Sequence, residues 1–164
     1  MKKLLISAFA LCFAGAIAAQ ESPLWMRHCV LSPDGTTIAF TYKGDIYTVP
    51  ATGGRATQIT TNPAFDTEPV WSPDGKQIAF ASDRMGSLDV FTVSKDGGVP
   101  QRLTTHSGSE KPVAYKDNNH ILFTANIAPS TEDAGFPSGQ FQQVYEVAVT
   151  GGRLVMFSSM PMEC

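Results

Sequence analysis

The sequence predicts an all-β fold built from about three similar units, and three observations support this prediction. First, Ser-Pro-Asp-Gly followed by Ile-Ala-Phe occurs at residues 32–40 and again at 72–80. Second, short runs such as residues 46–49 are rich in β-branched and aromatic side chains, which favour strands. Third, Gly and Pro punctuate the chain at intervals of about 8 to 12 residues, and no segment after the first twenty residues has helical periodicity.

The repeat extends beyond the shared turn. An offset of 40 residues relates the two Ser-Pro-Asp-Gly segments, and an offset of 44 relates residues 45–49 to 89–93, the Gly pair at 53–54 to 97–98, and residues 59–61 to 103–105. A third, less regular copy follows, with Val113, residues 121–123, residues 144–147 and the Gly pair at 151–152 in the same order. Lys-Asp-Asn-Asn at 116–119 replaces the turn there. Repeat periods in this range are typical of solenoids, arrays and propellers.

Each unit is long enough for four strands. Four strands of about 5 to 6 residues with connections of about 4 to 5 total roughly 40 residues. We therefore expect an incomplete β-propeller of about three four-stranded antiparallel blades, at about residues 24–61, 68–105 and 111–158 of a domain covering 20–164. A β-sandwich is the alternative, but it gives no reason for turn chemistry to recur at fixed offsets.

Residues 1–19 are predicted to be a signal peptide. Lys2 and Lys3 precede an apolar run over residues 4–17, and Ala-Ile-Ala at 16–18 fits a cleavage site near Ala19 or Gln20. A membrane anchor is the alternative, but the run is shorter than the roughly 20 residues that span a bilayer. We expect a secreted or periplasmic protein with no membrane span after cleavage.

The composition excludes several classes of protein. The 12 Lys and Arg against 15 Asp and Glu give a net charge of −3, which argues against a nucleic-acid partner. Three cysteines are too few for a disulfide scaffold. Cys29 lies in an apolar stretch and is expected to be a buried thiol, and its pairing with Cys164 stays open.

The repeated pattern resembles a known family. Ser-Pro-Asp-Gly, Ile-Ala-Phe, Asp-(Ile/Val)-(Tyr/Phe), Gly-Gly and (Ile/Leu)-Thr-Thr look like the WD-like blades of TolB and of the amino-terminal propeller of Tricorn-like proteases. The likeness covers about residues 24–158. It implies an exported Tricorn-type serine peptidase, in which a propeller gates peptides and a separate downstream domain carries the catalytic serine.

The sequence departs from that family in its length. Closed propellers have about four to eight blades, whereas this chain ends after three and leaves no residues for a peptidase domain. It looks truncated, and its partners are expected to include the missing blades and catalytic domain. Because open blade faces and strand edges would remain in water, we expect the isolated chain to be marginally stable or self-associating.

No catalytic, metal-binding or cofactor-binding residues are predicted within the chain. It lacks a Gly-x-Ser-x-Gly turn, a His-Glu-x-x-His motif and paired Cys-x-x-Cys motifs. His28, His106 and His120 are scattered. Asp34, Asp74 and Asp96 are interpreted as turn formers, Trp71 as a core residue, and Asp45 and Asp89 as buried partners of a neighbouring turn.

Binding is predicted at one end of the blades. The links between blades and the second-to-third loops share this end, and these loops lengthen from residues 41–44 to 81–88 to 124–142. Long loops on a rigid scaffold commonly carry binding sites. A mobile insertion without a role is the alternative for the last loop. The candidate binding residues are Asp66, Arg84, His106, Glu110, Phe136 and Phe141.

Two functions remain open. The chain is either the non-catalytic front of a secreted serine peptidase that gates peptides or docks domains, or a TolB-like envelope protein that binds other proteins. A peptide or protein partner is expected in both cases.

Overall fold

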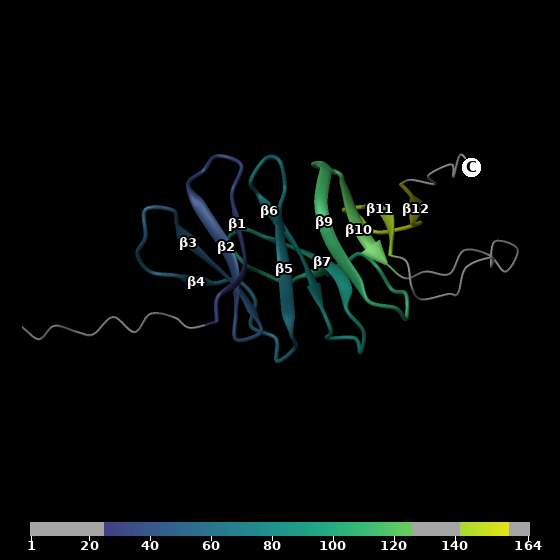
Figure 1. Ribbon diagram of the computed structural model, residues 1–164, viewed down its shortest axis with the longest axis horizontal. Coiled ribbons are helices and arrows are strands. Elements are labelled where there is room, and N and C mark those ends of the chain that lie inside the picture. The colour runs from purple at the N-terminus through teal and green to yellow at the C-terminus, as the bar shows by residue number, and fades with distance from the viewer. Residues whose placement is uncertain (1–24, 126–141, 158–164) are drawn as a thin grey trace, which may run out of the picture.

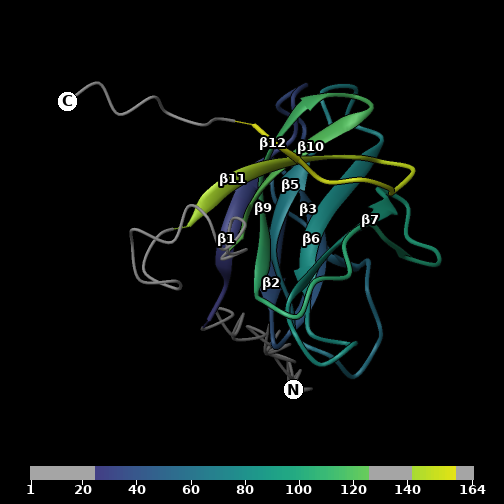
Figure 2. The same ribbon diagram turned by 90° about the vertical axis from the view of Figure 1, so that its right-hand side faces the viewer.

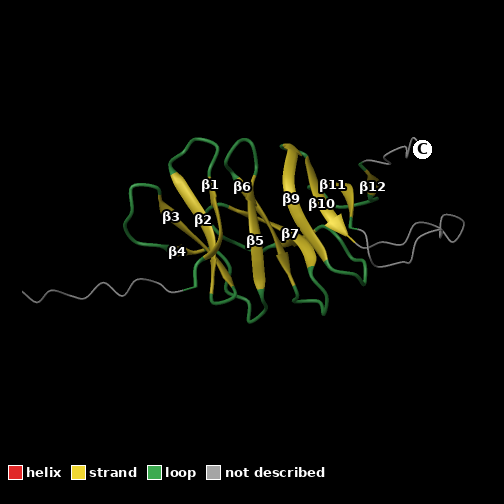
Figure 3. Ribbon diagram, viewed as in Figure 1, coloured by secondary structure: helices red, strands yellow, loops and turns green. Residues whose placement is uncertain are grey.

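The computed structural model describes residues 25–125 and 142–157 of the protein, and every regular element in these ranges is a strand (Figure 3). The twelve strands form three four-stranded sheets. The first sheet contains β1 (Arg27–Leu31), β2 (Thr37–Tyr42), β3 (Asp45–Pro50) and β4 (Thr57–Gln58). The second contains β5 (Asp66–Trp71), β6 (Gln77–Ser82), β7 (Asp89–Ser94) and β8 (Gln101–Arg102). The third contains β9 (Glu110–Asp117), β10 (His120–Ala125), β11 (Gln143–Ala148) and β12 (Val155–Met156).

The three sheets stand side by side in chain order (Figures 1 and 2). Within each sheet, consecutive strands pair antiparallel, so each sheet is a simple meander. Strand β5 packs against β1, β2 and β3, and β9 packs against β5, β6 and β7. The first strand of each sheet therefore makes much of the contact with the sheet before it. This arrangement confirms the prediction of an all-β row of three four-stranded blades.

The Ser-Pro-Asp-Gly segments form two matching turns. The Gly35 N–H donates to the Ser32 carbonyl at 2.9 Å, and Gly75 donates to Ser72 at the same distance. Glycine suits the fourth position because φ is +72° at Gly35 and +67° at Gly75. The Asp34 carboxylate accepts hydrogen bonds from the Ser32 hydroxyl at 2.6 Å and from the Thr36 N–H at 3.0 Å. These bonds lower the pKa of Asp34, so its ionised carboxylate stabilises the turn.

The first strand of every sheet carries a β-bulge at the same place. The pairing register shifts by one residue after Arg27 in β1, after Thr67 in β5, and opposite the Leu122–Phe123 step in β9. In the first two sheets the bulge holds His28 and Glu68 at φ of +51° and +54°. The register also corrects one sequence match, because Ala114 rather than Val113 takes the position of Val70.

The alternation in Ile-Ala-Phe separates the two faces of each sheet. In the second sheet, Ile78 and Phe80 belong to the core shared with the first sheet, whereas Ala79 belongs to the core shared with the third. All three side chains are fully buried. Bulky residues thus face the preceding sheet and a small residue faces the following one, so the second sheet is buried on both faces.

Two single-residue expectations have opposite outcomes. Trp71 is a core residue, as predicted, and its indole N–H donates to the Val30 carbonyl of the first sheet at 3.3 Å. The expectation that Cys29 is buried was wrong, because its side chain is exposed in the bulge of β1. Cys164 and the predicted signal peptide lie outside the described residues.

Ala79→Leu is expected to lower the free energy of unfolding by about 1–3 kcal/mol, because the added atoms must enter the filled core between the second and third sheets. Urea denaturation followed by fluorescence measures this change. Gln101→Leu, which adds the same side chain at an exposed position of the second sheet, is the matched control and should change stability by less than about 0.5 kcal/mol. Equal effects of the two variants would contradict the assigned packing.

Candidate functional site at the linker face

One end of the sheets carries the links between blades together with the second-to-third loops, and we call it the linker face. Backbone hydrogen bonds join these segments, since Asp66 N–H donates to the Gly44 carbonyl and Glu110 N–H donates to the Leu88 carbonyl, both at 2.7 Å. The second-to-third connection comprises residues 43–44 in the first sheet and 83–88 in the second. Both are shorter than expected because the strands extend further, but the predicted increase from first to second sheet is confirmed.

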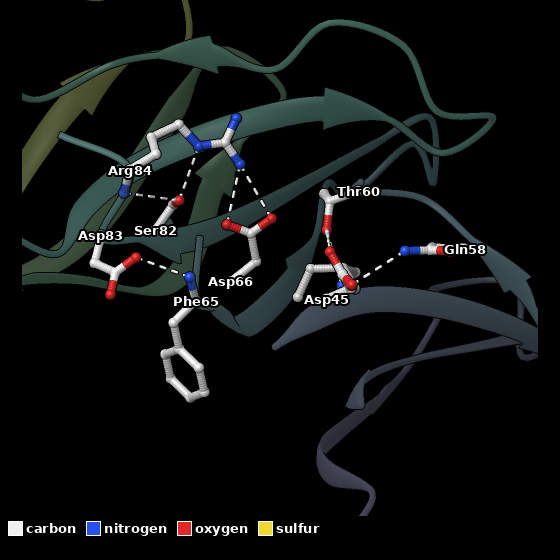
Figure 4. Close-up of polar contacts among 9 residues, drawn as sticks. Asp45, Gln58, Thr60, Phe65, Asp66, Ser82, Asp83 and Arg84 are labelled. Atoms are coloured by element: carbon white, nitrogen blue, oxygen red, sulfur yellow. Dashed lines mark hydrogen bonds and ion pairs between the residues drawn. The ribbon is translucent and has the colours of Figure 1, made fainter. Parts of the chain in front are cut away.

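Asp66 and Arg84, two of the predicted binding residues, contact each other. Arg84 Nη2 lies 3.0 Å from both carboxylate oxygens of Asp66, and Arg84 Nε donates to the Ser82 hydroxyl at 2.8 Å (Figure 4). The Asp66 side chain is fully buried and the Arg84 side chain is 10% exposed. This ion pair fastens the start of β5 to the loop that follows β6 within the second sheet.

Arg84 also packs against aromatic rings. Its guanidinium carbon lies 4.5 Å from the Phe91 ring centroid and 5.5 Å from that of Phe80. These distances are within the range of cation–π attraction. The charged end of Arg84 is thus held by a carboxylate, a hydroxyl and two ring faces, which fixes its position at the linker face.

A second polar contact recurs at the start of the third strand in the first and second sheets. Asp45 accepts hydrogen bonds from Gln58 Nε2 at 3.0 Å and from the Thr60 hydroxyl at 3.4 Å (Figure 4). In the second sheet, Arg102 Nη2 lies 2.8 Å from Asp89 Oδ2. Asp45 and Asp89 were expected to contact a neighbouring turn, but their partners come from the fourth strand and the link that follows it. Residue 102 stands 44 positions after residue 58, so the repeat conserves the geometry while replacing an amide by a guanidinium.

Glu110 takes the place of Asp66 at the next junction, but within the described residues no cation pairs with it as Arg84 pairs with Asp66. Its side chain is fully buried, and no donor in the described residues makes a well-formed hydrogen bond to either carboxyl oxygen. Residues 126–142, which follow β10 in the sequence, contain no Lys, Arg or His. Burial raises the pKa of Glu110, and the charge of Asp89 adds to this rise, whereas the Thr104 hydroxyl, His106 and Arg102 oppose it.

Of the three remaining predicted binding residues, the structure describes only His106. His106 lies in the link between the second and third sheets, where its Nδ1 accepts a hydrogen bond from the Gly108 N–H at 3.0 Å. Phe136 and Phe141 lie outside the described residues. The structure therefore brings Asp66 and Arg84 together, places His106 and Glu110 at the following junction, and leaves their binding role as a prediction.

Two apolar side chains on the linker face were missed in the sequence. Phe65 is 46% exposed in the first link, and Met85 is 60% exposed in the second-to-third loop of the second sheet. The Phe65 N–H donates to the Asp83 carboxylate at 2.8 Å, which ties the link to this loop (Figure 4). The sequence does place an aromatic residue, Phe65, directly before Asp66. This pattern indicates an exposed contact residue only once the links between blades are known to share an end with the second-to-third loops.

The opposite end of the sheets, the turn face, holds two shallow hollows of about 250 and 370 Å³ between the first and second sheets. Thr37, Trp71 and Lys95 line both. Counted over both hollows, three acidic and three basic side chains line them, so their combined charge favours neither anions nor cations. Within residues 25–125 and 142–157, no three His, Cys, Asp or Glu side chains are grouped to hold a metal ion, and no helix could cross a membrane.

Repeated meanders packed face to face, with links and loops collected at one end, define a β-propeller type of protein. The chain belongs to the family described as the Tricorn protease N-terminal β-propeller domain, which matches residues 23–162. It is similar to Tricorn protease homolog 1 of Streptomyces coelicolor, with 38% identity over 77 residues, which cover 47% of this chain. It is also similar to the Tol-Pal system protein TolB of Bordetella pertussis, with 46% identity over 54 residues, which cover 32% of this chain.

The structural comparison agrees with this assignment. A solved structure of a putative TolB from Agrobacterium tumefaciens has a TM-score of 0.63 and 28% identity over 80% of this chain. The matches cover 7% of the Streptomyces protein, 12% of the Bordetella protein and 47% of the Agrobacterium chain. The chain thus corresponds to a fraction of each relative.

Arg84→Ala is expected to reduce the free energy of unfolding by about 3–5 kcal/mol, because it leaves the buried Asp66 carboxylate without its cation. Chemical denaturation at pH 7 measures the loss. Lys95→Ala is the matched control, since Lys95 pairs with Asp96 on the surface at 2.9 Å and should contribute less than about 1 kcal/mol. A loss below about 1 kcal/mol for Arg84→Ala would rule out the anchoring role.

Glu110→Gln is expected to stabilise the protein at pH 8 by about 1 kcal/mol or more, because it removes a buried carboxyl that makes no ion pair within the described residues. The raised pKa of Glu110 means that its protonated form is favoured in the folded state of the unmodified protein. The stability that this protonated carboxyl contributes is fully present below the pKa of the unfolded chain, near 4.5, and is lost as the pH rises through the pKa of the folded state.

Melting temperatures recorded between pH 4 and pH 9 test the expected direction of this pH dependence. The difference between Glu110→Gln and the unmodified protein should widen as pH rises. Asp66→Asn is the control at the equivalent position, and it should destabilise the protein at neutral pH because it weakens the Arg84 ion pair. A difference for Glu110→Gln that is constant with pH would contradict the expectation.

Proposed function

We propose that this chain is the non-catalytic propeller portion of an exported Tricorn-like serine peptidase and that its linker face binds peptides or docks a neighbouring domain. The observation that carries this proposal is the match of residues 23–162 to the Tricorn N-terminal propeller family. The likeness to Tricorn protease homolog 1 supports the link to a peptidase. In this proposal the chemistry belongs to another domain, and this chain selects or positions its substrate.

The linker face supplies a physical basis for binding. Arg84 and Asp66 hold the underlying backbone, while Phe65 and Met85 stay exposed above it. Exposed apolar side chains on a rigid polar frame are typical of surfaces that bind extended peptides or protein loops. His106 adds a polar group in the next link, and the loop that contains Phe136 and Phe141 is proposed to contribute at the same end.

Export to the periplasm or beyond forms part of the same proposal. The cationic start and apolar run of residues 1–17 support it.

A TolB-like envelope protein is the second candidate, favoured by the 46% identity to the Bordetella protein. In that case the propeller binds other envelope proteins and no peptidase domain is attached. The coding sequence that follows codon 164 distinguishes the two. A frame that continues into a serine peptidase domain favours the first candidate, and a stop soon after the last blade favours the second.

Binding at the linker face is tested with fluorescein-labelled tryptic peptides of casein and fluorescence anisotropy. The double variant Phe65→Ser/Met85→Ser should weaken binding at least about tenfold because it removes the exposed apolar contacts. Val99→Ser is the matched control, since Val99 is 95% exposed but lies on the turn face, and it should leave affinity unchanged.

Equal loss in both variants, or no loss in the double variant, would contradict a binding site at the linker face. The same preparations are incubated with the peptides and examined by mass spectrometry. Cleavage products that persist after further purification would contradict a non-catalytic role for this chain.

A further inference from the structure

The two links between sheets, residues 59–65 and 103–109, are fastened by matching backbone hydrogen bonds. At the start of the first link, the Ile59 N–H donates to the Ile46 carbonyl at 2.8 Å. At the start of the second link, the Leu103 N–H donates to the Val90 carbonyl at 2.9 Å. Both links end on the 2.7 Å bonds from the first residues of β5 and β9 to the loop of the sheet before. The first link is therefore an internal reference for the second.

The junction between the first and second sheets leaves one of its acids in contact with water. Arg84 pairs with the fully buried Asp66, and Asp45 is close enough to interact with Asp66 electrostatically. Asp45 is partly exposed and accepts hydrogen bonds from Gln58 and Thr60. Partial burial raises the pKa of Asp45, but both donors oppose this rise. Because one acid has an arginine and the other has water and two donors, both can stay ionised.

The junction between the second and third sheets buries the acid that lacks an arginine. Arg102 pairs with Asp89 at 2.8 Å. Glu110 interacts with both residues electrostatically, and its side chain is fully buried without a well-formed hydrogen bond among the described residues. A buried carboxylate without a partner costs far more free energy than a protonated carboxyl, because nothing around it stabilises the charge. The Glu110 carboxyl is therefore more stable in this junction with a proton than without one.

The charged and titratable groups that face Glu110 come from three elements. Asp89 of β7 repels a negative charge there, whereas Arg102 of β8 and His106 of the second link attract it. Among the other strands packed on β9, β6 carries no charged side chain. The acids of β5 have cations of their own, in the pairs Asp66 with Arg84 and Glu68 with Lys111. A proton on Glu110 removes the repulsion by Asp89, and a proton on the His106 imidazole would supply a cation, so both protonations favour a closed junction.

We propose that the second link is a pH-sensitive latch, which is closed while Glu110 holds a proton and opens when that proton is released to solvent. Opening lets the carboxylate reach water and breaks the backbone bonds that the Leu103 and Glu110 N–H groups make to the second sheet. His106 lies in this link and moves with it. Because the link belongs to the linker face, opening also weakens the peptide binding proposed there, and this consequence rests on the proposed function.

The electrostatics of the junction gives the direction of the response. Burial raises the pKa of Glu110 above its ordinary value of 4.5. The stability that the proton gives to the closed link is fully present below pH 4.5 and is lost as the pH rises through the pKa of the closed state. The first link should respond little over the same range, because its buried acid, Asp66, keeps an arginine.

Amide hydrogen exchange of the full chain at pH 5 and pH 8.5, followed by mass spectrometry, tests the latch without any ligand. After correction for the pH dependence of intrinsic exchange, fragments covering residues 103–110 should exchange at least about tenfold faster at pH 8.5. Fragments covering residues 59–66 should change less than about twofold. An unchanged second link, or an equal change in both links, would overturn the proposal.

Glu110→Gln assigns the effect to this carboxyl. The amide keeps the size of the side chain and carries no charge at either pH, so residues 103–110 should exchange as slowly at pH 8.5 as those of the unmodified protein at pH 5. Asp96→Asn, which neutralises a 77% exposed acid on the turn face, is the control and should keep the full response. Circular dichroism at both pH values establishes that each protein is folded. A response that persists in Glu110→Gln would overturn the latch.

Fluorescence anisotropy at the same two pH values tests the effect on binding, with tryptic peptides of casein that carry tetramethylrhodamine. The affinity of the unmodified protein should fall at least about fivefold from pH 5 to pH 8.5, and that of Glu110→Gln by less than about twofold. Equal pH dependence in both proteins would overturn the control of binding by the latch. Absence of binding at both pH values would instead contradict the proposed function, and hydrogen exchange alone would then decide on the latch.

Discussion

A sheet with two apolar faces is stable only when both are covered, and this constraint governs the whole architecture. The second sheet satisfies it by placing Phe80 and Phe91 against the first sheet and Val90 against the third. Because the contact surfaces follow the chain order, each blade depends on its neighbours rather than on a core of its own. The row of blades then acts as a rigid support from which links and loops project at one end.

Polar contacts at the linker face complete this support. The buried pair of Asp66 and Arg84 fixes the entry of the chain into the second sheet, and Asp89 with Arg102 fixes the start of β7. Glu110 repeats the position of Asp66 without an ion-pair partner among the described residues, which makes the junction before the third sheet electrostatically different from the one before the second. The repeat therefore preserves the shape of its junctions while their charge balance varies.

Local features were predictable from the sequence, whereas contacts between sheets were not. The Ser-Pro-Asp-Gly turns and the strands that follow depend on residues a few positions apart, so their patterns identified them directly. The Asp66–Arg84 pair joins residues 18 positions apart, and the sequence marked both residues as candidates without indicating that they bind each other. The exposure of Cys29 was missed because a bulge, which changes the direction of a side chain, has no clear signature in an apolar run.

Each sheet is built only from strands that are consecutive in the chain, and this arrangement affects how the number of blades can change during evolution. No strand of one sheet pairs with a strand of another sheet. Duplication or deletion of one segment of about 44 residues, with boundaries in the links, would break no backbone pairing inside any remaining unit. Unequal recombination between the near-identical turn sequences could in this way lengthen or shorten the array by whole blades, with side-chain fit at the new boundary as the main barrier.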